Sequence, residues 1–266
     1  MTIDDYLNKL PETTEHIDIS NRRLCRCPSL ARFKNLKTLH CHLNNLKQLP
    51  ELPNSVEILF CHCNQLTNIP RLPKNLKIFH ADYNQLTHIS EFPSGIDEIS
   101  LYDNPLTSLP PLPPNLHYLN CSKNQLKSLP FLPQNLRVLL CDKNRLETLP
   151  TLPPQLIHLS CEYNPLKTLP ELPRSIAKLE LEHTGIYDEI LMTDNPYEIR
   201  EIVNKIHRFR VAYYTLKFKQ RFRDLLWLKV RLPKIERANH PDLLRESVEG
   251  VGSEEELEEV VENFGI

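Results

Sequence analysis

The sequence predicts a solenoid of short stacked strands, and two columns of repeated residues are the basis for this prediction. A shift of 20 residues superposes asparagine at seven positions, from Asn44 to Asn164. The same shift superposes a second column, which holds Cys, Ala or Leu and runs from Cys41 to Cys161. A fixed period in this range indicates a solenoid, in which each repeat is buried only by its neighbours.

Each repeat is expected to contain one short strand with an inner and an outer face. In the segment "VEILFCHCNQL", Leu59 and Cys61 fall on the inner face. Ile58, Phe60 and His62 alternate with them and fall on the outer face. This alternation is the period of a strand with one face buried. Stacked repeats would then form one parallel sheet.

The chain is expected to leave each strand through an asparagine and to return through prolines. Asn64 follows the strand, where its amide can bond to backbone groups that the turn would otherwise leave unpaired. The asparagine column is therefore predicted to be structural. In the return segment, Pro70 and Pro73 fix φ and remove two N–H donors. These prolines favour an extended, polyproline-like path over an α-helix.

These residues carry a resemblance to leucine-rich repeat proteins, and the doubled "LPxLP" motif resembles the short repeats of bacterial effectors. The match covers residues 17–190. Arg22 and Thr184 stand where the first and last units should have asparagine, as in terminal capping repeats. The resemblance implies an α/β solenoid with a parallel concave sheet and an extended, proline-rich convex side. It does not imply one particular function, because leucine-rich repeats serve many.

A change of composition near residue 195 indicates a further region after the repeats. We predict an N-terminal cap at residues 1–16, a leucine-rich repeat solenoid at 17–190 and a helical C-terminal region at 191–266. Residues 196–237 contain twelve Lys or Arg against four Asp or Glu, with the apolar spacing of a helix.

The remainder of the C-terminal region is acidic. Residues 238–266 carry nine acidic residues and one arginine. The segment "LLWLKVRLPKIERANHPDLL" resembles C-terminal segments of proteins from giant DNA viruses that infect amoebae. That resemblance implies a viral protein that acts in the host cell cytoplasm.

Charge, hydropathy and the first ten residues favour a soluble intracellular protein. The formal net charge is -2, and no apolar run approaches the roughly 20 residues that span a bilayer. The start "MTIDDYLNKL" lacks the basic and apolar regions of a secretory signal. The cysteines of the inner column are predicted to be small buried hydrophobes with reduced thiols. Cys25 and Cys27 form C-x-C without a second pair at zinc-finger spacing, which argues against a structural zinc.

No motif in the sequence specifies a reaction or a cofactor. Ubiquitin ligases of the bacterial effector type need a catalytic cysteine, and no cysteine follows Cys161. Five scattered glycines provide no phosphate-binding loop. His158, Ser160 and Glu162 superficially resemble a nucleophile with a base and an acid, but successive outward side chains of a strand lie about 6 to 7 Å apart. We predict no catalytic residue, no cofactor and no enzyme activity.

Histidines form rows on the predicted outer face. His42, His62 and Asp82 should lie side by side, with His40 and His80 one outward column away. Neighbouring strands are close enough for such side chains to share a metal. Exposed histidine rows also serve as polar surface or partner contacts, and four-coordinate closure is not assured. We therefore predict no metal site.

The outer face is predicted to bind a protein partner, because it holds apolar and aromatic side chains where charges would be enough for solubility. The candidate partner-binding residues are Ile58, Phe60, His62, Ile78, His80, Tyr83, Tyr102, Tyr118, Val138 and Leu140. An alternative that stays open is that the C-terminal helices of the chain cover some of them. Asp142, Glu162 and Glu182 form an acidic row that could meet a basic partner or the protein's own basic helix.

The alternative function is association with nucleic acid through the basic C-terminal helix. The residues concerned are Lys217, Lys219, Arg221, Arg223, Lys229 and Arg231. A dense basic helix can neutralise phosphates. The chain is nearly neutral overall, however, so we expect no general binding of nucleic acid and no association with membranes.

Overall fold

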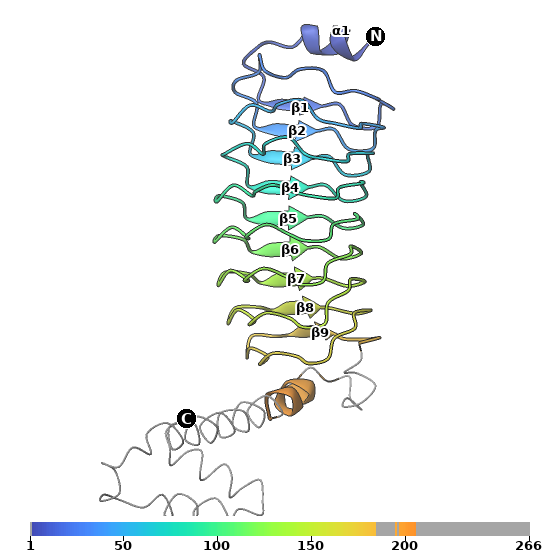
Figure 1. The fold of residues 1–266 in the computed structure, drawn as a ribbon. Coiled ribbons are helices and arrows are strands. Elements are labelled where there is room, and N and C mark those ends of the chain that lie inside the picture. Colours follow the sequence, from blue (N-terminus) through green and yellow to red (C-terminus); the bar gives the residue numbers. More distant parts are fainter. Residues whose placement is uncertain (1, 185–194, 196, 206–266) are drawn as a thin grey trace, which may run out of the picture. The chain divides into compact units, whose positions relative to one another are not determined.

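Nine strands of three residues stack in chain order into one parallel sheet in the described part of the chain (Figure 1). The structure is a computed structural model that describes residues 2–184, 195 and 197–205. The strands are β1 (His16–Asp18), β2 (Thr38–His40), β3 (Ile58–Phe60), β4 (Ile78–His80), β5 (Glu98–Ser100), β6 (Tyr118–Asn120), β7 (Val138–Leu140), β8 (His158–Ser160) and β9 (Lys178–Glu180). The predicted parallel sheet of a solenoid is confirmed.

The core lies on one side of this sheet and is built by residues in register. The middle residue of each strand from β1 to β8 is buried, whereas the first residue is at least partly exposed. Leu39 pairs with Leu59, and Leu59 pairs with Phe79. Burying each such side chain contributes about 1.5 to 3 kcal/mol. The core therefore grows by the same increment with every repeat.

An asparagine ladder closes the turn after each strand. The Asn64 Nδ2 donates to the carbonyl oxygens of Cys61 at 3.0 Å and His62 at 3.3 Å in its own repeat. It also donates to the Cys41 carbonyl of the preceding repeat at 3.0 Å. Its Oδ1 accepts from the Leu46 backbone N–H at 3.0 Å. Each buried amide thus joins two successive repeats, and the predicted structural role of this column is confirmed.

The residue before each ladder position is left-handed. Positive φ angles of 51 to 58° occur at Leu43, Cys63, Tyr83, Asp103, Lys123, Lys143, Tyr163 and His183. None of these residues is glycine, although this conformation is disfavoured for side chains with a Cβ atom. The ladder therefore holds these residues in the left-handed conformation, which is unfavourable for them in isolation.

The return segments contain no helix between residues 19 and 184, all of which the structure describes. Their leucines turn into the core, as Leu49 and Leu52 show with exposed fractions of 6% and 9%. The repeats therefore close on the side opposite the sheet with extended and turn backbone alone.

The helix α1 (Ile3–Asn8) precedes β1 at the N-terminal end of the solenoid (Figure 1). Thr2 begins it with a capping box, in which its Oγ1 accepts from the Asp5 backbone N–H at 3.1 Å. Leu7 is buried in the core of the solenoid. Arg32 donates to the carbonyl oxygens of Leu7 and Leu10. These contacts attach α1 to the first repeat.

The chain divides into two units, Met1–Val203 and Asn204–Ile266. At the end of the first unit, residues 197–203 are helical, and Ile199 and Val203 are buried. Arg200 donates to the Arg174 carbonyl oxygen at 3.2 Å. The rest of the predicted helical region, residues 191–194, 196 and 206–266, lies outside the described residues.

The cysteines of the inner column are buried free thiols, as predicted. They are Cys41, Cys61, Cys121, Cys141 and Cys161. Burial raises the pKa of the Cys121 thiol to about 12, so it stays protonated. In the described residues, no helix is long and apolar enough to cross a membrane.

We predict that Asn124→Ala lowers the free energy of unfolding by at least about 2 kcal/mol, because it leaves buried backbone groups unpaired. Asn124 Nδ2 donates to three carbonyl oxygens at 3.0 to 3.1 Å, and its Oδ1 accepts from the Leu106 N–H. Urea denaturation measures the change. Asn115→Ala, at an exposed position of the preceding return segment, is the control and should shift stability by less than about 0.5 kcal/mol. Equal effects of the two variants would contradict the ladder.

We predict that the left-handed turns respond to residue type in a defined order. Leu43 is half exposed with φ 55°, so its substitution changes backbone preference more than packing. Leu43→Val should lower the melting temperature, because a β-branched residue adopts this conformation less readily than leucine does. Leu43→Asn should keep or raise it, since asparagine adopts this conformation more readily. The reverse order would show that the turn is not strained.

Candidate functional site

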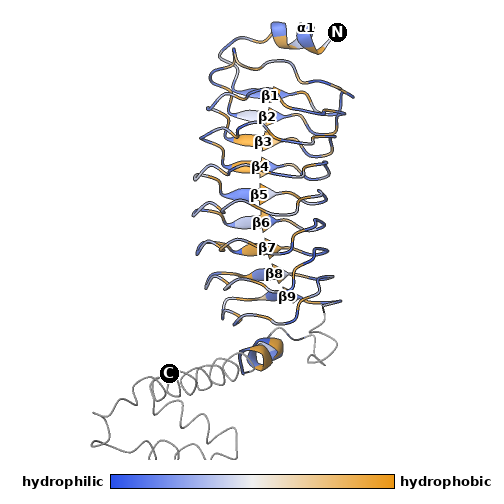
Figure 2. Cartoon of the chain, viewed as in Figure 1, coloured by the Kyte–Doolittle hydropathy of each residue, from blue (hydrophilic) through white to orange (hydrophobic). Residues whose placement is uncertain are grey.

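The outward side of the sheet presents three columns of side chains. We call this surface the strand face. It consists of residues 38, 40 and 42 with their equivalents at 20-residue intervals up to 178, 180 and 182, together with residues 16, 18 and 20. Figure 2 shows that β3, β4 and β7 are its most hydrophobic strands.

Nine of the ten predicted partner-binding residues lie on the strand face, and all nine are partly exposed. They are Ile58, Phe60, His62, Ile78, His80, Tyr102, Tyr118, Val138 and Leu140. Tyr83 was predicted for an outward strand column, but it lies in the left-handed turn with φ 53°. Its half-exposed ring packs edge-on against Tyr102 at 5.1 Å between centroids. Tyr83 therefore extends the surface at its edge.

Five aromatic rings stack on β2, β3 and β4 and the residues that follow them. Phe60 lies between His40 and His80, with ring centroids 4.9 and 4.8 Å away and interplanar angles of 19° and 26°. In the next column, His42 and His62 stack at 4.4 Å. We call these five residues the imidazole patch. The partly exposed phenyl ring of Phe60 is at its centre.

The patch favours neutral imidazoles at two positions. Burial lowers the pKa of His62, and the neighbouring His42 lowers it further. The pKa of His42 is lowered by burial and then by His40. The Nδ1 atoms of both rings are buried without a hydrogen-bond partner. If one imidazole of the stack is protonated, a proton on its neighbour would place a second positive charge beside the first, at a site with little solvent.

The outward row of His42, His62 and Asp82 does not converge on a point. His42 and His62 present ring faces to each other, with an interplanar angle of 15°. Asp82 turns to the next repeat, where its Oδ1 accepts from the Ser100 hydroxyl at 2.5 Å and the Tyr102 N–H at 2.7 Å. In residues 2–184, 195 and 197–205, no group of three His, Cys, Asp or Glu side chains is arranged to hold a metal ion.

The histidine and the serine of the triad-like group on β8 are each paired elsewhere. His158 Nε2 lies 2.9 Å from Glu180 Oε2, on the neighbouring strand. The Ser160 hydroxyl donates to Asp142 Oδ1. Asp142 also accepts from the Glu162 N–H at 2.9 Å. The serine and the histidine are therefore used in separate contacts between repeats, and this arrangement provides no nucleophile with its base.

Sequence reasoning missed these polar pairs between repeats. His80 Nε2 lies 2.8 Å from Glu98 Oε1, and His158 pairs with Glu180 in the same manner. The two Asp–Ser pairs, at Asp82 and Asp142, are 60 residues apart and have the same geometry. Their signal in the sequence is an outward aspartate followed 18 residues later by serine.

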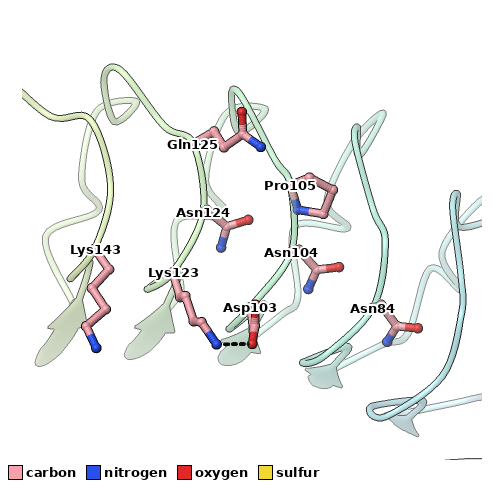
Figure 3. Close-up of a pocket in the computed structure, with 8 residues that line it drawn as sticks. All are labelled: Asn84, Asp103, Asn104, Pro105, Lys123, Asn124, Gln125 and Lys143. Atoms are coloured by element: carbon pink, nitrogen blue, oxygen red, sulfur yellow. Dashed lines mark hydrogen bonds and ion pairs between the residues drawn. The ribbon is translucent and has the colours of Figure 1, made fainter.

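A shallow pocket of about 310 Å³ lies at the turns (Figure 3). Its lining residues are Asn84, Asp103, Asn104, Pro105, Lys123, Asn124, Gln125 and Lys143. The three asparagines belong to the ladder, and Lys123 pairs with Asp103. The pocket is thus formed by groups that already serve the fold.

The six basic residues of the alternative nucleic-acid function lie outside the described residues. The alternative that C-terminal helices cover the strand face also involves residues that lie outside the described part of the chain.

We predict that the imidazole patch makes stability depend on pH. The pKa values of His42 and His62 in the folded protein lie below the ordinary histidine value of 6.5. The unfolded chain therefore binds protons first as the pH falls below that value, so stability is lost between the unfolded-state pKa and the lower folded-state pKa, below which both states are protonated and the loss is complete. His62→Gln should reduce the loss of stability between about pH 7.5 and about pH 5.5.

His88→Gln is the matched control, because His88 is exposed and lies outside the strand face. It should keep the pH dependence of the parent protein. Chemical denaturation at both pH values measures the difference. A His62→Gln protein with the full pH dependence would show that the stacked imidazoles accept protons freely.

Comparison with known proteins places the geometry in a structural class. No protein-family model matches the chain, and no curated protein does either. The structure is similar to YopM from Yersinia enterocolitica WA-314, with 34% identity and a TM-score of 0.65 over 66% of this chain. A Shigella effector leucine-rich repeat domain matches with 24% identity and a TM-score of 0.52, over 62% of this chain and 77% of that domain.

The match spans 39% of the length of the YopM chain. These similarities confirm the leucine-rich repeat fold that the repeats predict.

Proposed function

We propose that this chain is a non-catalytic protein-interaction platform that binds a protein partner through the strand face. The observation that carries the proposal is the imidazole patch. Phe60 is stacked between two imidazoles, yet it remains partly exposed on a sheet face that no described residue covers. An ordered, exposed aromatic ring can enter a contact with little further loss of conformational freedom.

The surroundings of Phe60 support a contact surface. Ile58 and Ile78 lie beside it in the first outward column and pair with each other in register. Further along the sheet, Val138 and Leu140 expose aliphatic surface on β7. Contiguous apolar surface of this kind marks binding sites more often than it serves solubility. Aromatic anchors at the centre of a contact supply much of the binding energy.

The leucine-rich repeat fold supports a general role in binding proteins. Leucine-rich repeat proteins are generally protein-interaction modules, and repeat solenoids offer extended surfaces for binding. The ladder fixes the spacing of every outward column, so the surface is rigid before a partner arrives. Rigid presentation reduces the ordering cost of association.

The proposal keeps the regional division predicted from the sequence, with a cap at residues 1–16, repeats at 17–190 and a helical region at 191–266. Viral origin, an intracellular location and action in a host cytoplasm also stay predictions. They rest on the composition of the chain and on the resemblance of its C-terminal segment. On this view, the partner is either a viral or a host protein.

We predict that Phe60→Glu weakens partner binding by about 30-fold or more, as expected for the loss of an aromatic anchor worth about 2 kcal/mol. Folding should be spared, because Phe60 is partly exposed and faces away from the core. Affinity capture from an extract of the source cell, followed by titration of the captured partner, measures binding. Thermal denaturation measures folding.

Phe131→Glu is the matched control, because Phe131 is 93% exposed in a return segment, away from the strand face. It should change neither binding nor melting. A normal melting curve with retained partner in Phe60→Glu would remove the imidazole patch from the binding site. A strongly lowered melting temperature would show that other residues of the protein cover Phe60.

A further inference from the structure

Acidic residues greatly outnumber basic residues on the strand face, although the solenoid as a whole is nearly neutral. Residues 2–184 contain 19 Lys or Arg and 18 Asp or Glu, so the solenoid is nearly neutral. The strand face nevertheless carries seven carboxylates and a single lysine, Lys178. The carboxylates belong to Asp18, Asp82, Glu98, Asp142, Glu162, Glu180 and Glu182. A surface of one sign attracts partners of the other sign and raises their rate of association.

Five of these seven carboxylates are compensated within the solenoid. Asp18 accepts from the Ser20 hydroxyl and N–H, and the two Asp–Ser pairs have been described above. Glu98 and Glu180 pair with histidines of neighbouring strands, and Glu180 also pairs with Lys178. Hydrogen bonds to serine and histidine hold these groups in place.

Glu162 and Glu182 are different, because neither carboxylate has a hydrogen bond or an ion pair with any described residue. Both follow the last two strands, in the column that begins the turn. Burial raises the pKa of Glu162, and the nearby charges of Asp142, Glu182 and Glu180 raise it further. The nearby His183 lowers the pKa of Glu162, but by less than the carboxylates raise it, so like charge dominates at this end of the face and an approaching cation would relieve the repulsion.

Apolar groups lie on the strands that precede these carboxylates along the sheet. Val138 pairs in register with His158, and Leu140 pairs with Ser160, two residues before Glu162. On the other side of β7, Tyr118 of β6 pairs with Val138. A ligand that spans this area therefore meets aliphatic and aromatic surface next to free negative charge. Lysine and arginine chains match both parts, with apolar stems and cationic ends.

We propose that the strand face from β6 to β9 docks a basic peptide segment of a separate protein partner. Lys or Arg side chains of the segment pair with Glu162 and Glu182, while its apolar groups lie on Tyr118, Val138 and Leu140. The inference rests on the proposed function and names the chemistry of the partner. It assigns the partner's cationic part to the end of the face opposite the imidazole patch.

The basic residues 196–237 of this chain share the chemistry of such a segment. They are followed by residues 238–266, whose nine acidic residues against one arginine offset that charge within the same region. A separate polypeptide is therefore the better match for the free carboxylates. Occupation by the chain's own segment is an outcome that the experiment below detects.

The test uses the full chain and a fluorescein-labelled peptide of twelve alternating lysines and leucines, with an alternating glutamate–leucine peptide for comparison. Fluorescence anisotropy gives the dissociation constants. The lysine peptide should bind more tightly, and the double variant Glu162→Gln, Glu182→Gln should weaken it about tenfold, as expected for two partly exposed ion pairs. The effect should shrink as salt rises from about 50 to about 200 mM. Equal binding of the two peptides overturns the inference.

The double variant Glu51→Gln, Glu171→Gln is the matched control. It removes the same charge from exposed positions in return segments, outside the strand face. It should leave binding of the lysine peptide unchanged, and an equal loss would reduce the effect to net charge and overturn the inference. Arg221→Glu, Arg223→Glu should not raise affinity for the lysine peptide. A rise would show that the chain's own basic segment occupies the face, which overturns a separate partner.

Two further readings separate this inference from the proposed function. The melting temperature of Glu162→Gln, Glu182→Gln should equal or exceed that of the parent, because the substitutions remove repulsion without removing a partner. Loss of the captured partner in Phe60→Glu, together with no effect of the glutamate variant on the lysine peptide, overturns only the inference. Loss of lysine-peptide binding in the glutamate variant, with the captured partner retained in Phe60→Glu, contradicts only the role of the imidazole patch.

Discussion

The hydrogen bonds of one buried amide in each repeat are the interaction on which the rest of the structure depends. An asparagine such as Asn64 bonds to carbonyl groups of its own repeat and of the preceding one. These bonds satisfy backbone groups that a sharp turn would bury unpaired, and they hold the residue before each asparagine in a left-handed conformation. Because the ladder recurs every 20 residues, it sets the register of all the outward columns.

The strand face follows from that register. Inner positions take leucine, phenylalanine and cysteine because they are enclosed by adjacent repeats, so outer positions are free to vary without loss of the fold. The outward residues differ in chemistry from one end of the sheet to the other. Aromatic rings gather around Phe60, whereas free carboxylates gather at Glu162 and Glu182. A single rigid sheet thereby presents two chemically distinct areas to a partner.

The period of the sequence was enough to predict the strands, the core residues and the asparagine ladder, since each depends only on position within a repeat. Nine of the ten candidate residues lie on the outward face of the sheet, as the period predicts, for the same reason. Tyr83 was misplaced, because position 83 does not share the alternation of the outward residues 78, 80 and 82 and instead lies in the left-handed turn that follows them. The pairs His80–Glu98 and His158–Glu180 were missed, because they depend on side-chain rotamers between repeats, which the period does not encode.

The most direct test of the account is to place a photo-crosslinking phenylalanine derivative at position 60 of the full chain and to identify what it captures in the source cell. The account predicts a covalent adduct with a second polypeptide, and no such adduct from the same derivative at position 131. Crosslinking of position 60 only to residues of its own chain, or equal capture from positions 60 and 131, would contradict the assignment of the strand face as the binding surface.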